Sequence, residues 1–338
     1  MTCTAPPASL GRTVVDLIEQ AKQNPPKWHI PDILLEDGVH VLHGHEETFK
    51  TILTVQLHEA LSKGGRFMLR DVPGGLITGI AELEMKNRQF GHRLAKFFPA
   101  SPPDIRVLPD SERCRLLAAS AAKNRIGVIA EWAVREGLQF VSIDSAVKLF
   151  PPGCDLNKAD LASDVFSQLQ KLPTVWIIAH DRKVLPGYEG KSGNAEIVGS
   201  GRFAQDPDVI HQMVRDDKRA PMAVFHWGKM RDGEKHDPMQ LFFDKFDYRL
   251  YPLHPFLHLL EQKAMLGSEL VTEAERRYGW KERRAREHLA TLPTLLDASG
   301  KPCVTETMEG HSKVYELKSR AVAVQGTGLD DLERVPES

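Results

Sequence analysis

The sequence predicts an α/β protein in which helices cover a mostly parallel sheet, followed by a small C-terminal winged helix-turn-helix domain. Two observations predict the α/β part. Short, uniformly apolar runs are typical of strands buried on both faces, and they alternate with longer stretches at helical periodicity. The expected strands are residues 39–42, 76–81, 138–143, 175–179 and 222–225, and the expected helices are residues 50–62, 86–98, 111–135 and 161–171.

Length and composition restrict the class of protein. A chain of 338 residues is long enough for about two domains. The net charge of −2 excludes coating of nucleic acid by bulk charge but leaves room for a local basic patch. No apolar run is long enough to span a membrane, and the N-terminus has no secretory signal, so we expect a cytoplasmic protein with no membrane partner. The four cysteines lie far apart, which argues against structural zinc and disulfides.

Changes in composition divide the chain into four expected segments. They are an N-terminal lead-in helix in residues 1–27, the α/β core in 28–252, a C-terminal domain in 253–320 and a disordered tail in 321–338. Pro25 and Pro26 are expected to end the lead-in helix. Within the core, the polar and glycine-rich residues 181–201 are expected to form a mobile loop.

The loop after the first core strand has the chemistry of a phosphate site. Gly44, Lys50 and Thr51 fit the P-loop template G-x-x-x-x-G-K-[ST], whereas Phe49 replaces the second glycine. Backbone N–H groups at the helix start would face phosphates, the lysine would reach the β and γ oxygens, and the hydroxyl would bind Mg²⁺. We expect Phe49 to fit if its φ stays negative; the alternative is an ordinary strand–turn–helix. The expected nucleotide-binding residues are Gly44, His45, Glu46, Glu47, Thr48, Phe49, Lys50, Thr51 and Ile52.

A second acidic position supports the phosphate site. The apolar strand at residues 138–143 is followed directly by Asp144. Such a carboxylate can accept hydrogen bonds from a Mg²⁺-bound water and from the Thr51 hydroxyl, so we expect both residues at the metal. The alternative is a strand-end aspartate that caps the next turn.

Taken together, these residues resemble the RepA-like branch of the RecA-type hexameric ATPases, whose relatives include the RepA and DnaB replicative helicases. The resemblance covers about residues 26–250, and a Phe-Lys-Thr loop is a known variant there. It implies a RecA-like P-loop core that uses ATP and Mg²⁺. It also implies a homo-oligomeric, hexameric ring that acts on single-stranded or replication-origin DNA.

The same resemblance suggests roles for four further residues. Glu84, in a Leu-Glu-Met turn, matches the glutamate that polarises the attacking water, with Glu82 as its rival. His180 matches a sensor of the γ-phosphate, and Lys229 and Arg231 match a Lys-x-Arg element that reaches a neighbouring subunit's nucleotide. The alternatives are a solvated carboxylate at a helix start, a structural histidine and a basic hairpin face.

Residues 198–213 resemble that family's glycine- and serine-rich turn, which follows the strand that ends at His180. Ser200 and Arg202 would then lie near nucleotide or DNA.

The C-terminal domain has the pattern of a winged helix. We expect helices at about 255–265, 268–278 and 281–292, with Gly279 in the turn, and a hairpin at about 302–317 as the wing. The alternative is a helical docking domain with a solvated basic face. The expected DNA-binding residues are Arg276, Arg277, Lys281, Arg283, Arg284 and Arg286.

These features predict an ATP-dependent DNA helicase or translocase that acts in replication or DNA remodelling. One alternative is a DNA-binding regulator or loader that uses ATP as an assembly switch with little hydrolysis. Another is a scaffold that binds no nucleotide. No histidine set has zinc-site spacing, and no G-x-S-x-G motif marks a serine hydrolase.

Overall fold

The structure is a computed structural model that describes most of the α/β core and parts of the C-terminal region. The described residues are 14–100, 102–181, 197, 201–215, 222–234, 236, 238–245, 248–251, 255–260, 263–278, 281–291, 304–310 and 312–318. The predicted tail and most of the predicted glycine-rich loop, Ser200 included, lie outside these residues.

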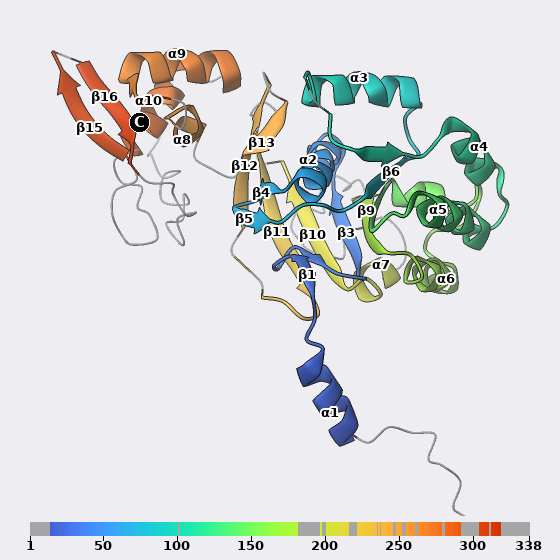
Figure 1. Cartoon of the computed structure of the whole chain (residues 1–338). Helices are drawn as coiled ribbons and strands as arrows, with labels where there is room; N and C mark the ends of the chain where they lie inside the picture. Colours follow the sequence, from blue (N-terminus) through green and yellow to red (C-terminus); the bar gives the residue numbers. More distant parts are fainter. Residues whose placement is uncertain are drawn as a thin grey trace, which may run out of the picture.

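A nine-stranded sheet forms the centre of the molecule (Figure 1). Its order is β13-β12-β11-β10-β3-β9-β8-β6-β7, and the six strands from β10 to β7 are parallel to one another. The predicted mostly parallel sheet is therefore confirmed, and the parallel strands end at one shared edge. The strands are β3 (Val39–Gly44), β6 (Thr78–Glu82), β7 (Ile105–Val107), β8 (Phe140–Asp144), β9 (Thr174–His180), β10 (Val209–Val214), β11 (Met222–Met230), β12 (Met239–Asp244) and β13 (Arg249–Tyr251).

The sheet is larger than the sequence predicts on one side. Strands β11, β12 and β13 add antiparallel to β10, and β11 runs five residues beyond the predicted end at residue 225. Along β11, buried and partly exposed residues alternate, because this side of the sheet is covered less completely. A search for uniformly apolar runs therefore misses such strands.

Helices cover both faces of the sheet (Figure 1). On one face, α5 and α6 pack against Val41 and Ile177, whereas on the other α2 packs against Leu42 and Trp176. Because neighbouring strand residues point to opposite faces, each strand contributes to both layers. The core helices are α2 (Lys50–Lys63), α3 (Asn87–Phe97), α4 (Asp110–Ala118), α5 (Ala122–Glu136), α6 (Ala159–Leu169) and α7 (Arg202–Gln205), with a short 3₁₀ turn at Ala146–Leu149.

The predicted helix at residues 111–135 is wrong, because the chain forms two helices there. They are separated by residues 119–121. The buried guanidinium of Arg125 donates to the carbonyls of Leu117 and Ala119, and also to those of Lys148 and Phe150. Carbonyl groups released at the break thus find a buried partner, which a local reading of helix propensity does not reveal.

The lead-in helix α1 (Val14–Gln23) is followed by β1 (Trp28–Ile30) and β2 (Leu34–Leu35), which lie against the main sheet. Two buried histidines of the main sheet contact backbone carbonyls in the segment that contains β1 and β2. The Nε2 atom of His40 lies 3.0 Å from the Leu35 carbonyl oxygen, and that of His211 lies 3.0 Å from the Ile33 oxygen. Burial lowers the pKa of His40 to about 4 and that of His211 to about 3, so both rings are neutral at physiological pH.

The C-terminal region has its own small core. Its helices are α8 (Pro255–Leu260), α9 (Gly267–Tyr278) and α10 (Glu282–Thr291), and β14 (Met265–Leu266), β16 (Ser312–Leu317) and β15 (Val304–Glu309) form a sheet in that order. The predicted hairpin at about 302–317 is formed by β15 and β16, and Gly310 lies in its turn. Leu270 and Ala274 pack with Met222 and Phe242 of the central sheet.

Two further features complete the fold. After α2, a short antiparallel hairpin is formed by β4 (Gly65–Phe67) and β5 (Arg70–Val72). Among the described residues, the helices are all too short or too polar to cross a lipid bilayer.

Candidate nucleotide-binding site

The phosphate loop joins β3 to α2 at the edge where the parallel strands end. All residues of β3 are buried, and Gly44 is its last residue. A Cβ atom on Gly44 would lie 2.2 Å from the Met213 carbonyl oxygen of β10, so no larger residue fits there. The first glycine of the motif is therefore required by the close approach of two strands.

The ammonium group of Lys50 lies inside this loop. Its Nζ atom donates to the carbonyl oxygens of Gly44 at 2.8 Å and His45 at 2.6 Å, and to the Thr48 hydroxyl at 3.2 Å. Burial lowers the pKa of Lys50 to about 8, although the nearby carboxylate of Asp144 raises it. A polyphosphate in the loop would supply the negative charge that a buried ammonium group lacks.

Phe49 adopts the left-handed conformation that a glycine favours, with φ 66° and ψ 17°. The condition of a negative φ, under which we expected Phe49 to fit, is therefore not met. The conformation costs an L-residue about 1–2 kcal/mol. The Phe49 ring compensates by stacking on Phe243 of β12, with centroids 4.8 Å apart, and the Arg215 guanidinium lies over the Phe49 ring, 5.4 Å from its centroid. The loop interior is thus occupied by the Lys50 ammonium group, while the aromatic ring is held against β12.

The two loop glutamates are both exposed. The Glu47 side chain is 84% exposed, and its carboxylate lies 3.7 Å from Arg215. Glu46 and Glu47 are therefore directed to solvent, where water screens their repulsion of a phosphate.

Thr51 and Asp144 meet at the start of α2. The Thr51 hydroxyl donates to Asp144 Oδ2 at 2.7 Å. Burial raises the pKa of Asp144 above its usual value, and the hydrogen bond from Thr51 offsets only part of this rise. A hydroxyl and a carboxylate beside a phosphate loop fit Mg²⁺, which keeps several waters and takes its other ligands from phosphate oxygens. In the described part of the chain, no group of three or more His, Cys, Asp or Glu residues is arranged to hold a metal ion by itself.

The two rival glutamates have different environments. Glu82 is buried at the end of β6, and its Oε1 atom accepts the backbone N–H groups of Glu84 and Met85 at 2.8 Å each. Burial, together with the charge of Asp144, raises the pKa of Glu82 to about 7. Glu82 thus holds the turn together, whereas the partly exposed Glu84 has a carboxylate that can reach water.

His180 links Glu84 to the phosphate loop. It is the last residue of β9 and lies opposite Gly44 in the parallel ladder. Its Nε2 atom is 3.2 Å from Glu84 Oε1, the same oxygen that accepts the Ser145 hydroxyl. The hydrogen bond from His180, followed by that from Ser145, lowers the pKa of Glu84 to about 2. The structure therefore brings Lys50, Thr51, Asp144, Glu84 and His180 to one edge of the sheet.

The five residues at this edge lie in the part of the sequence that matches a known family. Residues 4–184 match the family described as AAA domain. The chain belongs to this family of P-loop ATPases. The matched range includes the phosphate loop of this AAA domain together with Glu84, Asp144 and His180.

Two solved structures are similar to this chain over part of its length. A DnaB-like replicative helicase, described with its interactions with primase, is 14% identical over 71% of this chain and 68% of its own, with a TM-score of 0.48. A KaiC-like protein from the hyperthermophilic archaeon Pyrococcus horikoshii OT3 is 13% identical over 68% of this chain and 100% of its own, with a TM-score of 0.45. Neither similarity is high enough to inform function. A search of curated proteins finds no match.

Lys229 and Arg231 lie at the opposite end of the central sheet from the phosphate loop. Met230 of β11 pairs with Val209, the first residue of β10, which in turn pairs with His40 near the start of β3. The Lys229 ammonium donates to the carbonyls of residues 205 and 207, and Arg231 forms an ion pair with Asp208 at 3.0 Å. These cations are therefore remote from the phosphate loop of their own chain.

Arg202, which the resemblance places near nucleotide or DNA, is the first residue of α7. Its guanidinium lies 3.5 Å from a carboxylate oxygen of Asp206, the residue that directly follows this short helix.

One buried pair beside the site was not predicted. His43 Nδ1 lies 2.6 Å from Asp181 Oδ1, and both side chains are inaccessible to solvent. The Asp181 backbone N–H also donates to the Gly44 carbonyl at 3.2 Å, so this pair supports the first residue of the loop. A signal existed in the sequence, because each residue directly adjoins a predicted site position. Without the strand pairing, however, nothing indicated that the two meet.

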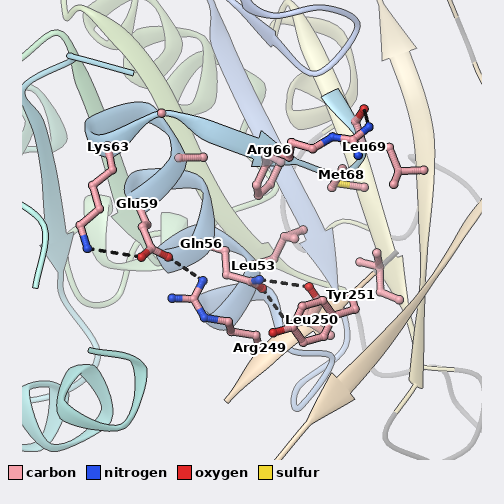
Figure 2. A pocket seen from close by; sticks show the side chains of 14 residues that line it. Leu53, Gln56, Glu59, Lys63, Arg66, Met68, Leu69, Arg249, Leu250 and Tyr251 are labelled. Atoms are coloured by element: carbon pink, nitrogen blue, oxygen red, sulfur yellow. Dashed lines mark hydrogen bonds and ion pairs between the residues drawn. The ribbon is translucent and has the colours of Figure 1, made fainter. Parts of the chain in front are cut away.

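A separate cavity lies along α2 (Figure 2). Its volume is about 450 Å³, and Lys50 and Thr51 do not line it. Its polar side chains bind one another or the backbone: Glu59 pairs with Arg249 at 2.6 Å, and Gln56 bonds the Leu250 backbone. This cavity is thus distinct from the phosphate loop, and its polar groups are already paired.

Proposed function

We propose that this protein is an ATP-dependent helicase- or translocase-type ATPase of the RepA-like class, which uses ATP and Mg²⁺ and acts on DNA in replication or remodelling. The observation that carries the proposal is the position of the Lys50 ammonium group, bonded inside a loop between β3 and α2. Backbone N–H groups at the start of α2 would join it in binding the phosphates.

The residues around the loop have complementary roles in this proposal. Thr51 and Asp144 hold Mg²⁺, which neutralises charge on the phosphate oxygens when it is bound. Glu84 orients and polarises the attacking water. His180 releases the Glu84 oxygen when a γ-phosphate arrives and so signals its presence.

Lys229 and Arg231 require a neighbouring subunit in this proposal. They lie at the opposite end of the strands from their own loop, so they can stabilise the transition state only at another chain's nucleotide. This arrangement supports a ring, which we propose to be a hexamer. Arg231 would exchange its ion pair with Asp208 for the phosphate.

The C-terminal region is proposed to be a winged helix that binds DNA. The element order α8-β14-α9-α10-β15-β16, with a β15–β16 hairpin after two helices, supports this fold. Lys281 and Arg283 are exposed, whereas Arg276 and Arg286 form ion pairs with Glu273 and Glu282 in their own helices. The side chains of the other two predicted arginines, at positions 277 and 284, lie outside the described residues.

One observation favours the alternative, a DNA-binding switch that binds ATP but hydrolyses little. Hydrogen bonds from His180 and Ser145 lower the pKa of Glu84 to about 2, which makes this carboxylate a weak base in the resting state.

Steady-state ATP hydrolysis with and without single-stranded DNA separates the two functions. A motor hydrolyses ATP and is stimulated strongly by DNA, whereas a switch binds ATP without turnover. Lys50→Ala is the matched loss-of-binding variant. Hydrolysis that this variant retains in full would contradict the assignment of the loop.

A further inference from the structure

Helix α3 carries a dense group of basic side chains that the function described so far does not use. Between residues 85 and 103 the chain contains Lys86, Arg88, Arg93 and Lys96, together with His92, and no acidic residue. This stretch contrasts with the whole chain, in which acidic residues slightly outnumber basic ones.

These side chains share one side of the helix. At about 100° per residue, Arg88, His92 and Lys96 recur every four positions, and Arg93 falls beside them. All four are exposed, whereas Phe90 and Phe97 point into the core. Figure 1 shows α3 at the upper border of the molecule, outside the layer formed by α2.

The charges of this face are not neutralised within the described part of the protein. There, Lys86, Arg88, Arg93 and Lys96 form no ion pair with a carboxylate; Lys96 lies 5.4 Å from the Tyr248 ring centroid. By contrast, Arg286 of α10 is 2.7 Å from a glutamate of its own helix. The α3 face is therefore better suited than α10 to bind a polyanion.

We propose that this α3 face binds the phosphate backbone of a nucleic acid. Arginine and lysine side chains on one exposed helix face, with no base-reading groups between them other than Gln89, suit sequence-independent backbone contacts. The inference rests on the proposed function for the choice of nucleic acid over other polyanions, and adds a second contact surface to the C-terminal one.

The position of α3 also links binding to the nucleotide site. The helix starts three residues after Glu84, and the carboxylate of Glu82 bonds the backbone N–H groups of Glu84 and Met85 in the connecting turn. A nucleic acid bound to α3 can therefore shift the turn that carries Glu84, the proposed water-polarising residue.

The test is fluorescence anisotropy of the full chain with a labelled single-stranded oligonucleotide over a range of salt concentrations, without nucleotide. The variant Arg88→Gln/Arg93→Gln/Lys96→Gln should lose about tenfold or more in affinity, and its salt slope should flatten by about 2, or about 0.7 per lost contact. The matched control, Lys123→Gln/Lys158→Gln/Lys171→Gln, removes the same charge from exposed positions elsewhere and should bind like the wild type.

A gain-of-charge variant keeps the proposal testable if the triple variant does not fold. Gln89→Arg adds a cation to the same exposed face and should tighten binding, with a salt slope steeper by about 0.7.

Four results would overturn the proposal. They are unchanged binding by the triple variant, an equal loss in the control, competition by polyglutamate as strong as by unlabelled oligonucleotide, or an altered oligomeric state with unaltered oligonucleotide binding. The last two would assign the face to an acidic protein or to a second copy of the chain. Failure of the proposed function is distinguishable, because an α3-dependent affinity in a chain that hydrolyses no ATP would contradict the motor and leave this face in place.

Discussion

Phe49 provides a sharp test of the loop geometry. Because its conformation is left-handed, a glycine variant at this position should be more stable than an alanine variant, the reverse of the usual order. Phe49→Ala keeps the conformational cost of about 1–2 kcal/mol that an L-residue incurs there. It loses a stacked pair of about 0.5–1.5 kcal/mol and, for a half-buried ring, about 1 kcal/mol of apolar burial. We therefore expect Phe49→Ala to lower the free energy of unfolding by about 2 kcal/mol.

Phe49→Gly loses the same ring contacts but removes the conformational cost. Glycine adds about 0.5–1 kcal/mol of backbone entropy in the unfolded chain, so its net advantage over alanine is about 0.5–1 kcal/mol. Urea denaturation followed by circular dichroism measures this difference.

Ile52, three residues further along in α2, supplies the control. There, in the first turn of the helix, the right-handed helical conformation favours alanine over glycine by up to about 1 kcal/mol, so the order of the two variants should reverse. An alanine variant at position 49 as stable as the glycine variant would refute a positive φ at this residue.

Three further outcomes follow from the same structure. Since His40 and His211 have pKa values lowered from 6.5 to about 4 and 3, the unfolded chain binds more protons than the folded chain below pH 6.5. Each ring should therefore lower the free energy of unfolding by about 3 kcal/mol or more by pH 4. Denaturation at constant ionic strength measures this loss, and a free energy of unfolding independent of pH between 6.5 and 4 would contradict it. Glu84→Gln should lower ATP turnover by about a hundredfold or more with nearly unchanged ATP affinity, whereas Glu82→Gln, which keeps the acceptor for the turn, should lower it by much less; equal losses would reverse the two roles. Arg231→Ala should bind ATP but turn it over slowly, and mixing it with a P-loop lysine variant should partly restore activity; no recovery would argue against a shared site.

The parallel core was predictable because its signal is local. Uniformly apolar strands such as residues 175–179, each followed by a polar residue, mark the strands and the edge where the site lies. The P-loop residues could be found in the same way, since Gly44, Lys50 and Thr51 are close together in the sequence.

The remaining features depend on contacts between distant segments. The pairing of His43 with Asp181 needs β3 and β9 side by side, and the conformation of Phe49 is compensated by Phe243, a residue on β12. Likewise, the break before α5 is stabilised by a buried arginine that reaches the 3₁₀ turn. Periodicity and propensity contain no information about these partners.

The basic face of α3 is an intermediate case. Its basic residues are visible in the sequence, but that they form no ion pair among the described residues can be judged only once the fold has placed the carboxylates.

Direct measurement of ATP·Mg²⁺ binding by isothermal titration calorimetry tests the central claim, that the loop at residues 44–51 binds a triphosphate through Lys50. The wild type and a control, Lys63→Ala at the exposed end of α2, should bind with equal affinity. Lys50→Ala should lose about a hundredfold or more, because it removes a charge-assisted contact from a buried site. Equal affinity of Lys50→Ala and the wild type, or no binding by the wild type, would contradict the account.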